Sequence, residues 1–301
     1  MRVLHIDTGR ELRGGQRQVL FLLQGLRKAG VQSTLLAHTG SPLFQSAAAM
    51  GIPVYPATLR TLRDQSKLID VVHAHEAHAH TSAALCARAP FVVSRRVAFP
   101  VKRSLLSEWK YRQASRYLAI SQFVASELAR SGISNGKIDL VYDCVQPDVT
   151  PAVWSLLEPA VALASRDPAK GRDLVIQAAR LANLTVVYSD DLPKDLLQAS
   201  MFIYITRSEG LGSATLLAMA MGIPVIASDI GGLSEALAHG QAGLLTSNDP
   251  VKIAAAINRL REDPALGQTL IERGKKHVAE FFTIQRMVDS TLASYQRALV
   301  G

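Results

Sequence analysis

A repeated alternation of short apolar segments with amphipathic stretches constrains the fold of this chain more than any other feature. The apolar segments are RVLHID (2–7), STLLAH (33–38), DVVHAH (70–75), FVVSRR (91–96), RYLAIS (116–121), KIDLVY (137–142), AVALAS (160–165), LTVVYS (184–189), MFIYIT (201–206) and IPVIAS (223–228). Strands covered on both faces read as nearly continuous apolar runs, and helices between them give parallel connections. The pattern therefore predicts α/β architecture with parallel sheets.

The alternation is interrupted around DCVQPDVTP (143–151), where Pro147 and Pro151 are typical of a linker. The same alternation then starts again, and the chain beyond about Asp249 has a helical pattern. We therefore expect two doubly wound α/β domains joined by a hinge, with ligands binding beyond the carboxyl ends of the strands.

Composition places the chain among globular proteins. Hydrophobic residues make up 48% and charged residues 19% of 301 positions, which excludes intrinsic disorder. The longest apolar run is interrupted by Gly222 and Pro224 and is too short to span a membrane. The N-terminal segment lacks the apolar core of a secretory signal, and Cys86 and Cys144 lack metal-type spacing. These features favour a cytoplasmic location.

Positive charge is concentrated in the first half. Residues 1–150 carry 19 Lys and Arg against 10 Asp and Glu, whereas residues 151–301 carry 14 against 15. Seven basic residues lie between Arg95 and Arg116, including Lys102 and Arg103, beside the apolar side chains of Leu105, Leu106, Trp109 and Tyr111. This combination favours contact with an anionic lipid or a phosphorylated acceptor. The alternative is a solvated helix with a buried apolar stripe.

Two loops of the first half follow predicted strands. Gly14 and Gly15 precede a helix, and such a turn lets backbone approach a phosphate. The loop is not a G-x-G-x-x-G fingerprint, and a simple flexible turn is the alternative. Arg95 and Arg96 directly follow another strand, where arginine suits phosphate or carboxylate recognition.

Four histidines occur within eight residues, at His73, His75, His78 and His80. We do not assign a metal site, because the segment spans a strand end and a helix start, so the four rings do not converge easily. One or two of them, His75 first, are candidates for hydrogen bonding to hydroxyl groups or for moving a proton. Structural or solvated histidines are the alternative.

Two strand ends of the second half carry opposite charges. Lys170 lies at a helix start after AVALAS, where its charge opposes the helix dipole unless an anion is bound, and Arg166 is nearby. An exposed lysine is the alternative. Glu209 precedes a glycine turn that opens the next helix. We expect the cation and the amides of Gly212 and Ser213 to hold a diphosphate, and Glu209 to accept hydrogen bonds from sugar hydroxyls.

These residues carry a resemblance to a known family. SEGLGSATLLAMAMGIPVIASDIGGLSEAL and DPAKGRDLVIQAA resemble the donor-site motifs of retaining GT-B-fold glycosyltransferases of family 4. RGGQRQVLFLLQGLRKAG and YLAISQFVASELARSGI are similar to its N-terminal landmarks. The resemblance implies a Rossmann-like acceptor domain (1–148), a Rossmann-like nucleotide-sugar domain (149–283) and a terminal helix (284–301) that returns to the first domain.

The resemblance also implies roles for individual residues. The donor, an NDP-sugar, would contact Gly14, Gly15, Arg166, Lys170, Glu209, Gly210, Leu211, Gly212 and Ser213. The acceptor would contact His73, His75, Arg95 and Arg96, and catalysis would involve Glu209, Lys170 and His75. Lys170, Arg166 and helix amides would stabilise the leaving diphosphate in place of a metal or other cofactor. An acceptor hydroxyl would attack on the face of the leaving group, with retention of configuration and no enzymic nucleophile.

The chain departs from the family pattern at several positions. Leu217 stands where a second glutamate usually holds the ribose, and Ser165 stands where an arginine is common. Arg95 and Arg96 replace a histidine that often follows this strand. One strand–helix step of the second domain is missing, near where the base normally packs.

The preferred interpretation is a hexosyltransferase-type enzyme that builds a cell-envelope glycan such as lipopolysaccharide, or a lipid-linked glycan, at the inner face of the cell membrane, with no nucleic-acid partner. One alternative is a non-catalytic partner of a glycosyltransferase that binds a sugar nucleotide or a lipid. A sugar-nucleotide epimerase is a weaker alternative. The base, the sugar, the acceptor and the oligomeric state are not readable from the residues.

Overall fold

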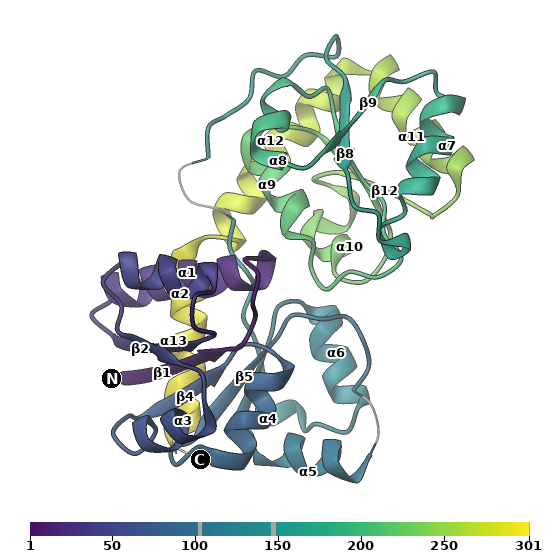
Figure 1. The fold of residues 1–301 in the computed structure, drawn as a ribbon. Helices are drawn as coiled ribbons and strands as arrows, with labels where there is room; N and C mark the ends of the chain where they lie inside the picture. Colours follow the sequence, from purple (N-terminus) through teal and green to yellow (C-terminus); the bar gives the residue numbers. More distant parts are fainter. Residues whose placement is uncertain (102–103, 146–148, 301) are drawn as a thin grey trace. The chain divides into compact units, whose positions relative to one another are not determined.

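The computed structural model describes residues 1–101, 104–145 and 149–300. It contains two compact units, unit 1 (Met1–Cys144 and Ile284–Gly301) and unit 2 (Val145–Thr283). Figure 1 shows a helix-covered sheet in each. Pro147 of the expected linker and the boundary at 148, with Lys102 and Arg103 of the basic run, lie outside the described residues.

Unit 1 is built on a seven-stranded sheet in the order β3-β2-β1-β4-β5-β6-β7, with every neighbouring pair parallel. The strands are β1 (Arg2–Asp7), β2 (Gln32–Ala37), β3 (Val54–Pro56), β4 (Val71–Ala74), β5 (Phe91–Arg95), β6 (Arg116–Ala119) and β7 (Ile138–Leu140). The helices are α1 (Gly14–Lys28), α2 (Pro42–Ala49), α3 (Leu59–Gln65), α4 (Ala77–Cys86), α5 (Leu105–Gln113), α6 (Gln122–Arg130) and α13 (Ile284–Val300). The strand order reverses direction between β1 and β4, which makes their carboxyl ends the topological switch point.

Unit 2 has a five-stranded parallel sheet in the order β12-β11-β10-β8-β9. The strands are β8 (Ala160–Leu163), β9 (Val186–Ser189), β10 (Phe202–Tyr204), β11 (Val225–Ser228) and β12 (Leu244–Thr246). The helices are α7 (Arg172–Leu181), α8 (Leu192–Asp195), α9 (Ser213–Met221), α10 (Leu233–Ala236), α11 (Pro250–Glu262) and α12 (Pro264–Phe281). Here the switch point lies between β8 and β10.

The predicted α/β class with two parallel sheets is confirmed, and each of the ten apolar segments overlaps one of the strands. The sequence analysis missed β3 and β12. Both are short strands at sheet edges, VYP and LLT, and neither lies in an extended apolar run like those that mark the three-residue strands β7 and β10.

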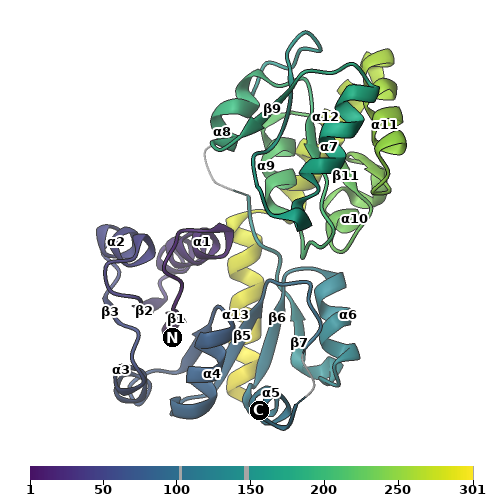
Figure 2. The ribbon, with the colours of Figure 1, turned by 45° about the vertical axis from the view of Figure 1, so that its right-hand side comes forward.

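Helix α13 comes from the end of the chain but packs in unit 1, along the sheet, as Figure 2 shows in yellow. Met287, Val288 and Tyr295 of this helix are buried in the same apolar core as strands β1, β4 and β5. Its polar anchor is Asp139, which accepts hydrogen bonds from Ser294 (2.7 Å) and Arg297 (2.8 Å). The last turns of the chain are therefore part of the unit 1 fold.

A helix long and apolar enough to cross a membrane is not found among the residues that the structure describes.

Candidate functional site

Each unit presents a group of polar side chains at its topological switch point. In unit 2, β8 leads to Lys170 at the end of a short 3-10 turn, and β10 leads to Glu209. The Nζ atom of Lys170 lies 2.9 Å from Oε2 of Glu209, with side-chain exposures of 30% and 18%. This pair is open enough to exchange partners with a ligand. The sequence analysis placed the two charges at one site, but it did not foresee that the carboxylate is the anion beside the lysine.

Tyr204 is the third member of this group, and sequence reasoning missed it. Its hydroxyl donates to Oε2 of Glu209 and accepts from Nζ of Lys170 at 3.2 Å. Tyr204 is buried at the end of β10. Its burial is the main reason, and the Glu209 charge the second, that its pKa lies well above the ordinary value. A tyrosine in an apolar strand gives no signal that its hydroxyl meets a charged pair.

Glycines shape the turn around Glu209. Gly212 has a φ of +96° and begins α9 without a side-chain cap, so the first-turn amides point outward. The backbones of Gly231 and Gly232 press on residues 209 and 210, where a Cβ would collide with the carbonyl oxygens of Glu209 and Gly210. An uncapped helix N-terminus beside a lysine is suited to an anion.

The remaining predicted donor residues of unit 2 surround this turn. Gly210 and Leu211 are buried, so they offer only backbone groups, whereas Ser213 at the start of α9 is exposed. Arg166 is exposed on the loop after β8, and the described residues give it no ion-pair partner. Leu217 lies in α9, as the sequence indicates, and supplies no carboxylate.

In unit 1, a cavity of about 370 Å³ lies at the carboxyl ends of β1 and β4. It is lined by Thr8, Gly9, Arg10, Glu11, Arg13, Gln16, Glu76 and His78. Glu76 caps α4 and accepts from the Thr8 hydroxyl at 2.8 Å, and Gln16 donates to Asp7 at 3.1 Å. Burial raises the pKa of Asp7. Among the residues that line this cavity, the sequence analysis singled out only His78. Thr8, Gln16 and Glu76 are single polar residues without a charge pattern.

The predicted glycines lie at the start of α1, beside this cavity. Gly14 is exposed and Gly15 is half-buried, with a Cβ position 3.8 Å from the Arg96 side chain. Both have ordinary negative φ, so the pair is not required by backbone strain.

The predicted histidines fall into two sets. His73 and His75 are buried and converge with His5, which the parallel register places opposite His73. His5 Nδ1 lies 3.0 Å from His75 Nε2, and His73 contacts the Tyr295 hydroxyl (2.7 Å) and Ser94 Oγ (2.8 Å). Burial lowers the pKa of all three, to about 3 for His5. The four rings of the segment do not converge, as expected, although His73 and His75 lie together and meet His5 from outside the segment.

These imidazoles are the one group of three metal-type ligands found in the described part of the chain. Both nitrogens of His73 already have partners within the protein, so His73 has no nitrogen available to an acceptor without displacing one of them. His75 is buried as well, although its Nδ1 lacks a partner among the described residues. His78 is exposed, and His80 is buried against aromatic rings.

The two adjacent arginines diverge. Arg96 donates to Asp143 at 3.0 Å and to the His75 carbonyl at 3.4 Å, so it reaches the switch point as expected. Burial raises the pKa of Asp143 even though this guanidinium lies beside it. Arg95 instead contacts the Tyr111 hydroxyl and the Phe99 carbonyl, on the side of α5. The structure therefore does not bring Arg95 to the cavity, as side chains alternate along a strand.

Two parallel α/β units, each with polar groups at its switch point, match the architecture of the GT-B class of glycosyltransferases. The model described as Glycosyltransferase Family 4 matches residues 12–149, and the model described as Glycosyl transferases group 1 matches residues 158–263. The chain therefore belongs to the glycosyltransferases that these two models describe.

Solved structures with the same fold cover nearly the whole chain. The structure of Anabaena Alr3699/HepE in complex with UDP matches with a TM-score of 0.84 and 18% identity, over 98% of this chain and 100% of that chain. A glycosyltransferase from Rickettsia africae has a TM-score of 0.83 at 16% identity, covering 99% and 98% of the two chains.

The curated relatives are matched over shorter segments. A D-inositol 3-phosphate glycosyltransferase from Acidothermus cellulolyticus is 34% identical over 38% of this chain and 26% of its own length. Another from Salinispora arenicola is 30% identical over 52% of this chain and 40% of its own length. The matched segments thus span well under half of these relatives.

Proposed function

We propose that this chain transfers a sugar from an NDP-sugar, bound in unit 2, to a hydroxyl of an acceptor bound in unit 1, with retention of configuration. The observation that carries this proposal is the site formed by Lys170, Glu209 and the uncapped start of α9 at the β8–β10 switch point. It combines groups for a diphosphate with a carboxylate for sugar hydroxyls.

Donor binding in this proposal is an exchange of ion pairs. The diphosphate binds Lys170, Arg166 and the first amides of α9, and these groups stabilise the charge of the leaving group in place of a metal. Glu209 then accepts hydrogen bonds from the sugar, since a carboxylate facing the phosphate directly would be repelled. The UDP in the HepE structure makes UDP the first nucleotide to test.

The acceptor in this proposal enters the unit 1 cavity, where Glu76 and Gln16 can bind hydroxyl groups and Arg10 can pair with an anionic substituent. Arg96 donates to the His75 carbonyl and lies near Gly15 at the start of α1, at the same switch point. The acceptor class we propose is a cell-envelope glycan or a lipid-linked glycan.

Calorimetry with UDP, GDP, ADP and TDP tests the donor site. We expect Lys170→Ala to weaken binding of the preferred nucleotide by about 1.5–3 kcal/mol, the range for a hydrogen bond to a charged group. Lys252→Ala, an exposed lysine of α11, is the matched control and leaves the affinity unchanged. Equal affinity in wild type and Lys170→Ala would remove this lysine from the site.

Turnover of NDP-sugars with lipid-linked acceptors tests the chemistry. We expect Glu209→Gln to lower turnover while the affinity for the free nucleotide stays close to wild type, because charge-assisted hydrogen bonds are roughly twice as strong as neutral ones. Nucleotide binding without turnover by the wild type would favour the alternative of a non-catalytic partner, to which Leu217 and the five-stranded sheet point.

We also propose that α5 docks unit 1 on an anionic membrane. Leu105 and Leu106 are 86% and 79% exposed, and Trp109, on the same side of the helix, is also exposed. Lys110 and Arg112 lie on either side of this apolar stripe. The alternative of a stripe buried on the sheet does not fit, since every residue of α5 is exposed or half-buried.

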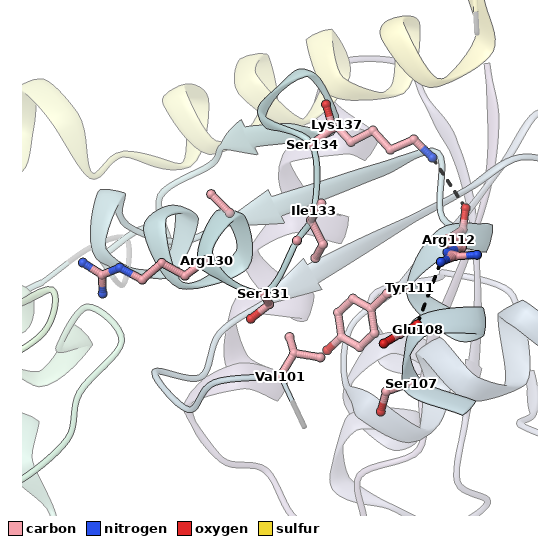
Figure 3. Close-up of a pocket in the computed structure, with 12 residues that line it drawn as sticks. Val101, Ser107, Glu108, Tyr111, Arg112, Arg130, Ser131, Ile133, Ser134 and Lys137 are labelled. Carbon is pink, nitrogen blue, oxygen red and sulfur yellow. Dashed lines mark hydrogen bonds and ion pairs between the residues drawn. The ribbon is translucent and has the colours of Figure 1, made fainter. Parts of the chain in front are cut away.

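A cavity lies beside α5. Its volume is about 600 Å³, and it lies between α5 and residues 129–137. Figure 3 shows the Tyr111 ring directed into it, with Glu108 and Arg112 at its edge. The Tyr111 ring packs against His80 and Tyr117, whereas Leu105 and Leu106 stay exposed on the outer face.

Vesicle co-sedimentation tests the membrane proposal. Binding should rise with the fraction of anionic lipid and fall as salt rises. Leu105→Gln with Leu106→Gln should reduce it, whereas Leu157→Gln, which changes an equally exposed leucine of unit 2, should not. Equal binding to neutral and anionic vesicles, or none, contradicts the proposal.

A further inference from the structure

Tyr204 is the only member of the unit 2 site, among the described residues, that contacts both charged groups while being buried itself. Its hydroxyl accepts from Nζ of Lys170 at 3.2 Å and donates to Oε2 of Glu209. The Lys170 ammonium also lies 5.6 Å from the centre of the tyrosine ring. The three groups form a closed triangle, because Lys170 and Glu209 contact each other directly.

The tyrosine is held more firmly than either of its partners. Tyr204 is the last residue of β10, and its ring stacks on Phe202 at 5.8 Å between centroids. Strand β10 pairs with β8 and β11 on its two sides. Lys170, by contrast, ends a short turn and keeps 30% of its side chain exposed. The hydroxyl of Tyr204 is therefore a fixed point against which the two charges are positioned.

The hydroxyl carries its proton at neutral pH in this setting. Burial and the neighbouring Glu209 carboxylate raise the pKa of Tyr204 well above its ordinary value. A neutral phenol has one O–H to donate, and the acceptor here is Glu209, while its lone pairs receive Lys170. The protonated phenol therefore donates to Glu209 and accepts from Lys170.

Glu209 has a second restraint on its other oxygen. Oε1 accepts from the Gly210 amide at 3.1 Å, so the carboxylate is held at both oxygens. When a diphosphate binds Lys170, as the proposed function requires, the contact from the lysine to Oε2 is weakened. The Tyr204 hydroxyl is then the side-chain donor that keeps Oε2 in place.

We propose that Tyr204 is a positioning residue, which holds the Glu209 carboxylate toward the donor sugar while Lys170 changes its partner from this carboxylate to the diphosphate. The inference rests on the proposed function for its catalytic consequence. Its geometric part, that Tyr204 keeps Oε2 of Glu209 in place when the lysine contact is lost, does not require a ligand.

Ligand-free crystal structures of Lys170→Ala and of Lys170→Ala with Tyr204→Phe test the geometric part. The first variant removes the lysine contact without a diphosphate, and we expect the Glu209 carboxylate to stay ordered beside the hydroxyl. In the double variant we expect it to leave this position. A displaced carboxylate in the single variant, or an unmoved one in the double variant, would overturn the inference.

Steady-state kinetics test the catalytic part, with the NDP-sugar that the turnover screen identifies. Tyr204→Phe should lower kcat about 10-fold and leave the donor KM within about 3-fold, because the hydrogen bond to a charged group is lost while the ring remains. In a Glu209→Gln background the same change should have no further effect. Tyr55→Phe, at an exposed position of unit 1, is the matched control and leaves kcat unchanged.

Additive effects of Tyr204→Phe and Glu209→Gln would mean that Tyr204 acts through general stability, and would overturn the inference. A wild-type protein without turnover on any NDP-sugar would contradict the proposed function instead. In that case the ligand-free structures still decide whether Tyr204 holds Glu209, so the two failures are distinguishable.

Discussion

Both units are parallel α/β sheets, but the polar side chains at their switch points differ in burial. At the unit 1 switch point the polar groups nearest the strands, His5, His73 and His75, are buried and bonded to one another or to the core. At the unit 2 switch point the Lys170–Glu209 pair stays partly exposed. Burial decides whether a polar group at a strand end is part of the framework or remains available to a ligand.

The comparison extends to charge. Unit 1 buries the ion pairs Arg96–Asp143 and Arg116–Asp139, whereas the Arg207–Asp173 pair of unit 2 is more than half exposed. The free energy of unfolding of unit 1 therefore depends more strongly on protonation and on charge pairing than that of unit 2.

The largest expected effect is acid destabilisation of unit 1. The folded state lowers the pKa of His5 and His80 to about 3, and those of His73 and His75 also lie well below the ordinary value, with burial as the main cause. The unfolded chain then binds more protons below pH 6.5, so stability falls as the pH falls through that value. Each histidine contributes about 1.4 kcal/mol between pH 7.5 and 5.5, or about 5.5 kcal/mol for four.

Hydrogen exchange at pH 7.5 and 5.5 measures this effect separately in β4 and in β10. Protection of β4 should fall far more than protection of β10, and His78→Gln, at an exposed histidine, should not alter the difference. Asp7 and Asp143 act in the opposite direction because burial raises the pKa of both, so the measured loss is at most the stated sum. Equal losses in the two strands contradict the prediction.

The next effect concerns the anchor of α13. Burial alone would raise the pKa of Asp139, but hydrogen bonds from Arg116 and Ser294 together with two arginine charges lower it. Asp139→Asn leaves the Arg116 charge without its partner and should destabilise unit 1 by about 3–5 kcal/mol. Asp173→Asn in the exposed pair of unit 2 should cost about 0–1 kcal/mol. Urea denaturation of both variants checks the contrast, and similar midpoints would refute it.

The smallest effect concerns two helical glycines. A Cβ at Gly25 of α1 would collide with Val288 and lie 2.7 Å from Ile284 Cγ2, both on α13, so Gly25→Ala should destabilise unit 1 by about 1–3 kcal/mol. At Gly274 of α12 the nearest atom is Cγ of Met219 at 3.1 Å, on a flexible side chain. Gly274→Ala should therefore change stability by less than about 1 kcal/mol, since alanine favours the helix. Thermal unfolding compares the two, and a larger loss for Gly274→Ala would reverse the comparison.

Much of the architecture was predictable because it depends on local patterns. Continuous apolar runs such as RVLHID and IPVIAS identify buried parallel strands, and the restart after residue 151 indicates a second sheet. The motif around Glu209 and the turn at Lys170 were also recognisable, since glycine turns and a charge at a helix start are written in adjacent residues. These features determine α/β class, family and the place of the donor motifs.

The contacts that give those residues their chemistry were decided by tertiary structure. His5 and His73 are far apart in the chain, and only the parallel pairing of β1 with β4 brings their rings together. Tyr204 reads as one more apolar strand residue until the switch point between β8 and β10 places its hydroxyl between Lys170 and Glu209. Strand order and register set these distances, and neither is encoded in the local periodicity from which the strands themselves are recognised.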